Sequence, residues 1–112
     1  MSEEKFDVII VGGGLAGLTA AYVLAKDGYE TMVIERGDYC GAKNMTGGRL
    51  YGHSLEKIIP GFANEAPVER KVVKETISLQ TKDGAVTIGY QSPKLGAANC
   101  ASYTVLRSKF DQ

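Results

Sequence analysis

The sequence predicts an α/β fold built around a parallel sheet, and three observations carry the prediction. The run FDVIIV, residues 6–11, is continuously apolar and rich in β-branched residues, as in a strand that is buried on both faces of a parallel sheet. A glycine-rich turn and then a helical pattern follow this run. A second strand-like run, ETMVIE, occupies residues 30–35. Strand, turn, helix and strand in this order form a βαβ unit, whose two strands are parallel.

The helix of this unit is predicted over residues 15–27. Small and apolar residues recur on one narrow face at spacings of three and four, namely Gly17, Ala20, Ala21 and Leu24. Small side chains on that face would let the helix lie close to the sheet. Gly28 stands where a glycine commonly ends a helix.

The middle of the chain changes character. Residues 37–52 are rich in glycine and lack periodicity, which predicts a long loop. Residues 53–59 predict a short helix that Pro60–Gly61 ends. Residues 62–70 are expected to be a connector.

The last part of the chain predicts further strands. Residues 71–80 alternate in part, Asp83-Gly84 is a strong hairpin turn signal, and residues 85–90 would be the returning strand. Residues 91–101 are rich in small and turn residues and predict a loop.

Residues 102–106 form a third strand-like run, and residues 107–111 look like the first turn of a helix. A chain of 112 residues is normally one domain. We therefore expect one domain over residues 1–112. Its segments are a βαβ unit (1–36), a glycine-rich loop with a short helix (37–70), and a hairpin, strand and helix start (71–112).

Composition excludes several classes of function. The chain carries 13 basic and 13 acidic side chains, so its formal net charge is zero and gives no electrostatic attraction to nucleic acid or to an anionic membrane. No apolar run approaches the roughly 20 residues that span a bilayer, and MSEEKFD has no signal-peptide pattern. Cys40 and Cys100 have no metal-binding spacing and are expected to be reduced cytosolic thiols. His53 is the single histidine, so we expect no metal site.

The glycines between the first strand and the helix form the pattern GxGxxG at Gly12, Gly14 and Gly17. Gly12 would permit the tight turn, Gly14 would let a pyrophosphate reach the backbone, and Gly17 would let the helix pack on the strand. The helix N-terminus would then offer free N–H groups to phosphates. This pattern indicates a dinucleotide-binding turn, and a glycine-rich turn without a ligand is the alternative.

Glu35 ends the second strand at about 20 residues beyond these glycines, where an acidic side chain accepts hydrogen bonds from the adenosine ribose. A 2′-phosphate would meet this carboxylate, which disfavours NADP. The alternative is a solvated carboxylate at a strand end. The pattern alone does not separate FAD from NAD.

The later segments GAKNMTGGRLY, APVERKV and VLRSKFD resemble a known family. They are similar to the N-terminal quarter of FixC-type flavoproteins, which are relatives of the electron-transfer flavoprotein–quinone oxidoreductases. The wider group is the glutathione-reductase-like FAD superfamily. The resemblance implies the N-terminal part of a Rossmann-like FAD-binding domain with an inserted β-hairpin.

FAD bound in an extended form is what this resemblance implies. Arg36 would flank the adenosine, the loop from Lys43 to Arg49 would pass the pyrophosphate toward the flavin, and Arg107 would face the phosphate–ribityl region. Lys43 and Arg49 could instead be solvated loop charges. The expected cofactor-binding residues are Gly12, Gly13, Gly14, Leu15, Ala16, Gly17, Glu35, Arg36, Lys43, Gly47, Gly48, Arg49 and Arg107.

The implied function is FAD-dependent electron transfer, from an electron-transfer flavoprotein toward a ferredoxin-like FixX-type protein or quinone. No catalytic side chain is assigned, since the flavin carries the redox chemistry. Family members are several times longer, so we expect a fragment without turnover of its own. We expect it to be cytoplasmic, and the resemblance implies contact of the full-length parent with the inner membrane surface.

Two alternatives remain open at this point. One is a flavin-dependent reductase or monooxygenase acting on a small or isoprenoid substrate. The other is a non-catalytic nucleotide-binding remnant.

Overall fold

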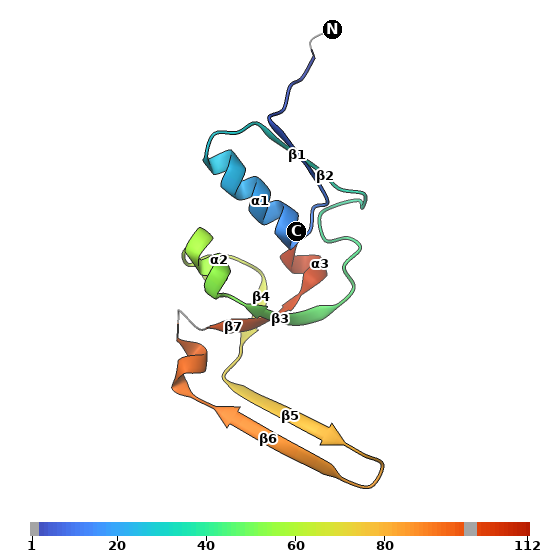
Figure 1. Ribbon diagram of the computed structural model, residues 1–112, viewed down its shortest axis with the longest axis vertical. Helices are drawn as coiled ribbons and strands as arrows, with labels where there is room; N and C mark the ends of the chain where they lie inside the picture. The colour runs from blue at the N-terminus through green and yellow to red at the C-terminus, as the bar shows by residue number, and fades with distance from the viewer. Residues whose placement is uncertain (1–2, 98–100) are drawn as a thin grey trace. The chain divides into compact units, whose positions relative to one another are not determined.

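The structure is a computed structural model in which residues 3–97 and 101–112 are described (Figure 1). It divides into two compact units, one formed by residues up to Gly48 together with Leu106–Gln112, and the other by Arg49–Val105. These units differ from the three segments expected from the sequence. The elements in chain order are β1 (Val8–Val11), α1 (Leu15–Lys26), β2 (Thr31–Ile34), β3 (Gly47–Tyr51), α2 (His53–Ile58), β4 (Val68–Lys71), β5 (Lys74–Gln80), β6 (Ala85–Gln91), β7 (Ser102–Leu106) and α3 (Arg107–Phe110).

The first unit contains the predicted βαβ arrangement. Strands β1 and β2 are parallel, in a register that runs from Val8 opposite Thr31 to Val11 opposite Ile34. Helix α1 connects them and packs against both strands. The helix ends at Lys26, and Gly28, just beyond the C-cap Asp27, has a φ of 92° and donates its N–H to the Ala25 carbonyl. The predicted role of this glycine at the helix end is therefore confirmed.

The turn between β1 and α1 depends on two glycines. Gly12 has a φ of 107°, a left-handed conformation that side chains disfavour. Gly17 lies so close to the turn that a Cβ there would collide with the Gly12 carbonyl oxygen and stand 3.3 Å from Ile10 Cγ2. The predicted turn at Gly12 and close packing at Gly17 are both confirmed.

Strand β1 differs from its prediction in burial. We expected it to be covered on both faces, but its side chains alternate, and Ile9 and Val11 are 57% and 84% exposed. The reason is that, within the described residues of the first unit, α1 packs on one face of the β1–β2 pair and the opposite face stays exposed.

The second unit contains most of a three-stranded sheet in the order β3-β7-β4. Strand β7 coincides with its predicted range and is antiparallel to β4, with a register shift between Val68 and Arg70. The core of the second unit contains the buried Phe62, Ala101 and Val105. The Phe62 ring meets the Tyr103 ring edge to face, with centroids 5.9 Å apart.

Two loop predictions were wrong in part. The glycine-rich segment 37–52 contains β3, and the supposed connector 62–70 contains a 3₁₀ turn at Phe62–Asn64 and most of β4. Both strands pair with β7, which is distant in sequence. Long-range pairing overrode a local composition that disfavours strands.

Strands β5 and β6 form an antiparallel hairpin in which Lys74 faces Gln91 and Gln80 faces Ala85. At the turn, the Thr81 N–H donates to the Gly84 carbonyl at 2.7 Å, so the tip lies one residue earlier than the predicted Asp83-Gly84 pair. One face of the hairpin is apolar and exposed; it carries Ile77, Leu79, Val86, Ile88 and Tyr90.

Two other predicted segments have regular structure. Helix α2 lies within its predicted range and ends before Pro60–Gly61. Part of the predicted loop 91–101 is a 3₁₀ turn at Pro93–Gly96, and residues 98–100 of that loop lie outside the described residues. In the part of the chain that the structure describes, no helix combines the length and the apolar character that crossing a bilayer requires.

The contact at Gly17 gives a direct test of the fold. Alanine favours a helix over glycine by about 1 kcal/mol, but here its methyl group would collide with the Gly12 carbonyl oxygen. We expect Gly17→Ala to lower the free energy of unfolding by about 1–3 kcal/mol, as overpacking does. Urea unfolding followed by circular dichroism measures this change.

Gly89→Ala is the matched control, because a Cβ at Gly89 would meet nothing within 4 Å. It should leave stability unchanged or raise it. A Gly17→Ala variant as stable as the Gly89→Ala variant would show that the helix does not depend on this close contact.

Candidate functional site

A cavity of about 430 Å³ opens beside the carboxyl ends of β1 and β2 in the first unit. Parallel strands commonly present ligand sites at this end, and the volume falls within the range of small-molecule sites. Five residues predicted from the sequence or the resemblance lie on its wall. The lining residues are Val11, Gly12, Gly14, Ile34, Glu35, Arg36, Gly41, Lys43 and Asn44.

Glu35 follows β2 and is held by two backbone amides. The Gly13 N–H donates to its Oε2 at 2.8 Å, and the Gly37 N–H donates to its Oε1 at 2.7 Å. The hydrogen bond from Gly37, followed by that from Gly13, lowers the pKa of Glu35 below its ordinary value. The carboxylate is therefore ionised at neutral pH and fixed, and each oxygen retains a lone pair for a further donor.

The glycines of the turn have different surroundings. A Cβ on Gly13 would stand 2.5 Å from Cys40 Sγ and 3.3 Å from Glu35 Oε2, so this glycine serves internal packing. A Cβ on Gly14 would meet only Arg107 Nη2, at 4.0 Å. Gly14 therefore leaves its backbone open to approach.

Gly14 is also the N-cap of α1, and the turn it begins is free of negative charge. No side chain caps the helix there, and its first turn carries no acidic residue. The first amide groups of a helix lack partners within the helix, and the helix dipole makes this end partly positive. An anion can therefore approach the N-terminus of α1 without repulsion from an acidic side chain in the helix's own first turn.

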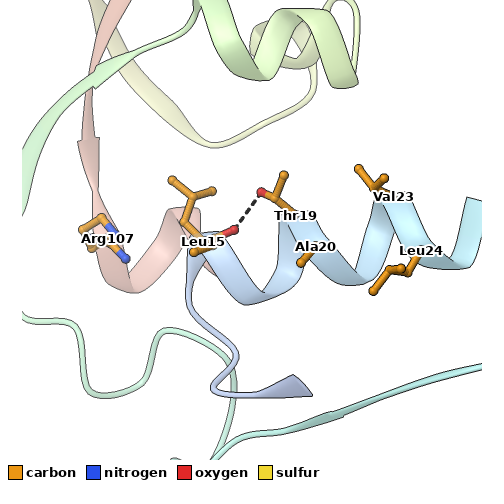
Figure 2. Close-up of a pocket in the computed structure, with 7 residues that line it drawn as sticks. Leu15, Thr19, Ala20, Val23, Leu24 and Arg107 are labelled. Atoms are coloured by element: carbon orange, nitrogen blue, oxygen red, sulfur yellow. Dashed lines mark hydrogen bonds between the residues drawn. The ribbon is translucent and has the colours of Figure 1, made fainter. Parts of the chain in front are cut away.

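Arg107 begins α3 and reaches this end of α1 from the opposite end of the sequence. Its Nη2 donates to Asp111 at 2.8 Å, and this ion pair raises the pKa of the guanidinium. Arg107 also stands at one end of an open groove of about 840 Å³ along α1 (Figure 2). The groove is otherwise lined by Leu15, Ala16, Thr19, Ala20, Val23 and Leu24. Leu15 and Ala16 thus line the groove rather than the cavity beside Glu35.

Eight of the predicted cofactor residues do not line the cavity, and three of these, Gly47, Gly48 and Arg49, lie in β3. Gly47 and Gly48 form the exposed start of β3. Arg49 has partners within the second unit: its Nε donates to Ser102 Oγ at 2.9 Å, it pairs with Glu75, and its guanidinium lies 4.5 Å above the Tyr51 ring.

Comparison with known proteins gives the family. A model described as "FAD dependent oxidoreductase" matches residues 7–104. The chain belongs to this family. Membership implies a Rossmann-like FAD-binding fold, and the cofactor of this family is FAD.

Curated relatives in this family are much longer than the chain. "Protein FixC" of Salmonella typhi is 59% identical over 111 residues, and the "Probable electron transfer flavoprotein-quinone oxidoreductase YdiS" of Escherichia coli (strain K12) is 57% identical over 111. "Protein FixC" of Rhizobium meliloti is 38% identical over 112 residues. Each match covers 99% or 100% of this chain but 26% of the relative, so the chain spans about a quarter of their length.

The residues of the first unit fit the adenosine diphosphate half of FAD. The open backbone at Gly14 and the uncapped start of α1 suit a pyrophosphate. The fixed carboxylate of Glu35 suits ribose hydroxyls, and the basic side chains of Arg36 and Lys43 line the same cavity. The fit is therefore in charge, in donor set and in backbone access.

Several residues at this site were missed by sequence reasoning. The Gly37 amide, Gly41 and Asn44 carry no local signal that separates them from other loop residues. Asp111 could have been found, because it follows Arg107 at the i, i+4 spacing of helical ion pairs.

Among residues 3–97 and 101–112, no group of three His, Cys, Asp or Glu side chains is arranged to hold a metal ion. Cys40 is a free thiol. Cys100, the other predicted free thiol, lies outside the described residues.

The lowered pKa of Glu35 predicts a pH-dependent contribution to stability. Glu35→Gln replaces a charged side chain that accepts hydrogen bonds from two backbone amides with a neutral one. We therefore expect a lower free energy of unfolding at neutral pH. The contribution of an ionised carboxylate is present above its unfolded pKa, near 4.5, and is lost as pH falls through the folded value. Urea unfolding at about pH 7 and about pH 3 should show a difference at the higher pH that shrinks at the lower.

Glu69→Gln on exposed β4 is the control and should change stability little at either pH. If Glu35→Gln lowers stability equally at both pH values, the ionised carboxylate is not what the two amides stabilise.

Proposed function

We propose that the first unit binds the adenosine diphosphate half of FAD. Glu35 accepts hydrogen bonds from the adenosine ribose, and Arg36 flanks the adenosine. Gly12, Gly13, Gly14 and Gly17 form the turn that brings the pyrophosphate to the start of α1. The observation that carries this proposal is the cavity that joins a fixed, ionised carboxylate to an open, uncapped helix N-terminus.

The cationic side chains neutralise the phosphates in this proposal. Lys43 lines the cavity, and Arg107 lies beside Gly14. A guanidinium near a pyrophosphate offsets part of its charge and can donate two hydrogen bonds at once. Leu15 and Ala16, in the first turn of α1, supply backbone amides at the same helix end.

The flavin half of the cofactor lies, in this proposal, beyond the adenosine diphosphate site. Gly47 and Gly48 allow close backbone approach along the path from Lys43, and the hairpin is an insertion in the FAD-binding domain. The contacts of Arg49 with Ser102, Glu75 and Tyr51 favour a structural role, so we do not include it among the ligands.

We propose that the full-length protein transfers electrons through this FAD, as its relatives' names suggest. Those names include an electron transfer flavoprotein-quinone oxidoreductase and FixC proteins. The proposed donor is an electron-transfer flavoprotein, and the proposed acceptor is a ferredoxin-like FixX-type protein or quinone, reached in the cytoplasm or at the inner membrane surface. FAD supplies the redox chemistry, and this chain's residues bind and orient its adenosine end.

The 112-residue chain is proposed to hold the cofactor's adenosine end without catalysing turnover. The relatives' sequences extend over about four times its length. Flavin-dependent dye reduction by the purified chain would contradict this part of the proposal.

Binding of different nucleotides tests the site. The chain, mixed with excess FAD and desalted, should keep about one flavin per chain by visible absorption, and isothermal titration should show ADP competing with FAD. FMN contains the flavin and one phosphate but lacks the adenosine monophosphate part of FAD, so it should bind far more weakly and compete poorly.

Glu35→Ala should weaken FAD and ADP binding about tenfold or more, since a charged hydrogen-bond partner of the ribose is removed. Glu69→Ala, on the exposed β4, should have no effect. A folded chain that binds neither FAD nor ADP, or that binds FMN as well as FAD, would refute the proposed function.

A further inference from the structure

Asp111 is a buried carboxylate whose role is not explained by the proposed ligand contacts. Only 1% of its surface is exposed, although it lies near the chain's last residue. Burying a carboxylate is costly unless hydrogen bonds and opposite charge compensate. Asp111 has both, because Arg107 and Asn44 donate to it.

The first partner of Asp111 is the guanidinium of Arg107. Its Nε donates to both carboxylate oxygens, at 3.1 and 3.2 Å, and its Nη2 donates to Oδ2 at 2.8 Å. This fork leaves three of the five guanidinium N–H groups for other acceptors. The same Nη2 stands 4.0 Å from the position of a Cβ on Gly14, so Arg107 is held beside the start of α1.

The second partner of Asp111 belongs to the wall of the cavity. Asn44 Nδ2 donates to Oδ2 at 2.5 Å, and Asn44 lines the cavity together with Gly41 and Lys43. Gly41 has a φ of 89°, and a Cβ there would stand only 3.0 Å from Asp111 Cβ and from the Ser108 carbonyl oxygen. The loop therefore rests directly on α3 around this carboxylate.

We propose that Asp111 is the positioning residue of the pyrophosphate site: it aims the Arg107 guanidinium at the start of α1 and holds the Gly41–Asn44 loop as the cavity wall. The inference rests on the proposed FAD site and deepens it. Asp111 itself touches no ligand. It acts through Arg107 and Asn44, which join residues far apart in the sequence.

Two physical effects of Asp111 oppose each other. Its negative charge offsets part of the positive charge of Arg107, so removing it would strengthen the attraction of that corner for phosphate if charge alone mattered. Its hydrogen bonds fix a flexible arginine in one geometry, so removing it would weaken binding if position mattered. The three bonds to Arg107 and the one to Asn44 lead us to expect that position dominates.

Asp111→Asn separates the two effects, because it removes the charge and keeps the side-chain size. Isothermal titration should show ADP binding weakened about tenfold, with adenosine binding unchanged because adenosine has no phosphate for Arg107. Asp83→Asn, at the exposed hairpin turn, is the matched control and should change neither affinity. Unchanged or tighter ADP binding, or an equal loss for adenosine, would overturn the inference.

The double variant tests whether Asp111 acts through Arg107. In an Arg107→Gln chain, adding Asp111→Asn should cost less ADP affinity than it costs in the wild-type chain, because only the part that acts through Asn44 is left, whereas two independent losses would add. Additive losses would overturn the inference.

Arg107→Lys keeps the test decisive if Asp111→Asn fails to fold. Lysine preserves the charge but cannot form the fork to Asp111, so ADP binding should fall and adenosine binding should not. Full ADP affinity in Arg107→Lys would overturn the inference. The wild-type chain separates the two proposals. If wild type binds FAD and these variants bind it equally well, only the role of Asp111 is refuted. If wild type binds neither FAD nor ADP, both proposals are refuted.

Discussion

The contact between Gly17 and the Gly12 carbonyl is the constraint on which the proposed site depends. It brings the first turn of α1 against the end of β1, closer than any side chain would allow. Because β2 runs parallel to β1, the residue after β2 arrives at the same end. Glu35 can then reach the Gly13 amide, and the helix N-terminus, the glycine turn and the carboxylate share one cavity. A longer distance between helix and strand would separate these groups.

A carboxylate beside a phosphate site would ordinarily repel its ligand, and the structure limits this effect. The Gly13 and Gly37 amides each donate a hydrogen bond to one carboxylate oxygen of Glu35, so they stabilise its negative charge and fix the side chain in one place. Basic side chains lie on the same wall at Arg36 and Lys43, and Arg107 stands beside Gly14. In the proposed site, this arrangement would give separate positions to the sugar and to the phosphates. That separation explains how one cavity can suit both halves of adenosine diphosphate.

Sequence reasoning succeeded where the determinants are local. The glycine spacing, the strand before it and the helix after it predicted the βαβ unit, because each residue's role depends on near neighbours. It failed at β3, where Gly47 and Gly48 disfavour a strand, and at β4, because pairing with the distant β7 decides the structure of both. Arg49 shows the same limit, since its partners Glu75 and Ser102 lie far along the chain. Asp111 was identifiable only as a partner of Arg107, and its bond to Asn44 could not be read from spacing.

Exposed apolar surface in both units would give a cofactor bound at the proposed site a second role, as a source of stability. Val11 on β1 and the apolar face of the β5–β6 hairpin face solvent, and no residue of α1 is buried. Little apolar burial means a small free energy of unfolding. A ligand that binds only the folded state adds stability, by about 2.7 kcal/mol at a concentration 100 times its Kd. All residues proposed for the adenosine diphosphate site in the cavity belong to the first unit, so this gain requires no particular placement of the second. Binding at Glu35 and Gly14 would therefore stabilise the βαβ unit itself, joining strand ends, helix and loop through one ligand.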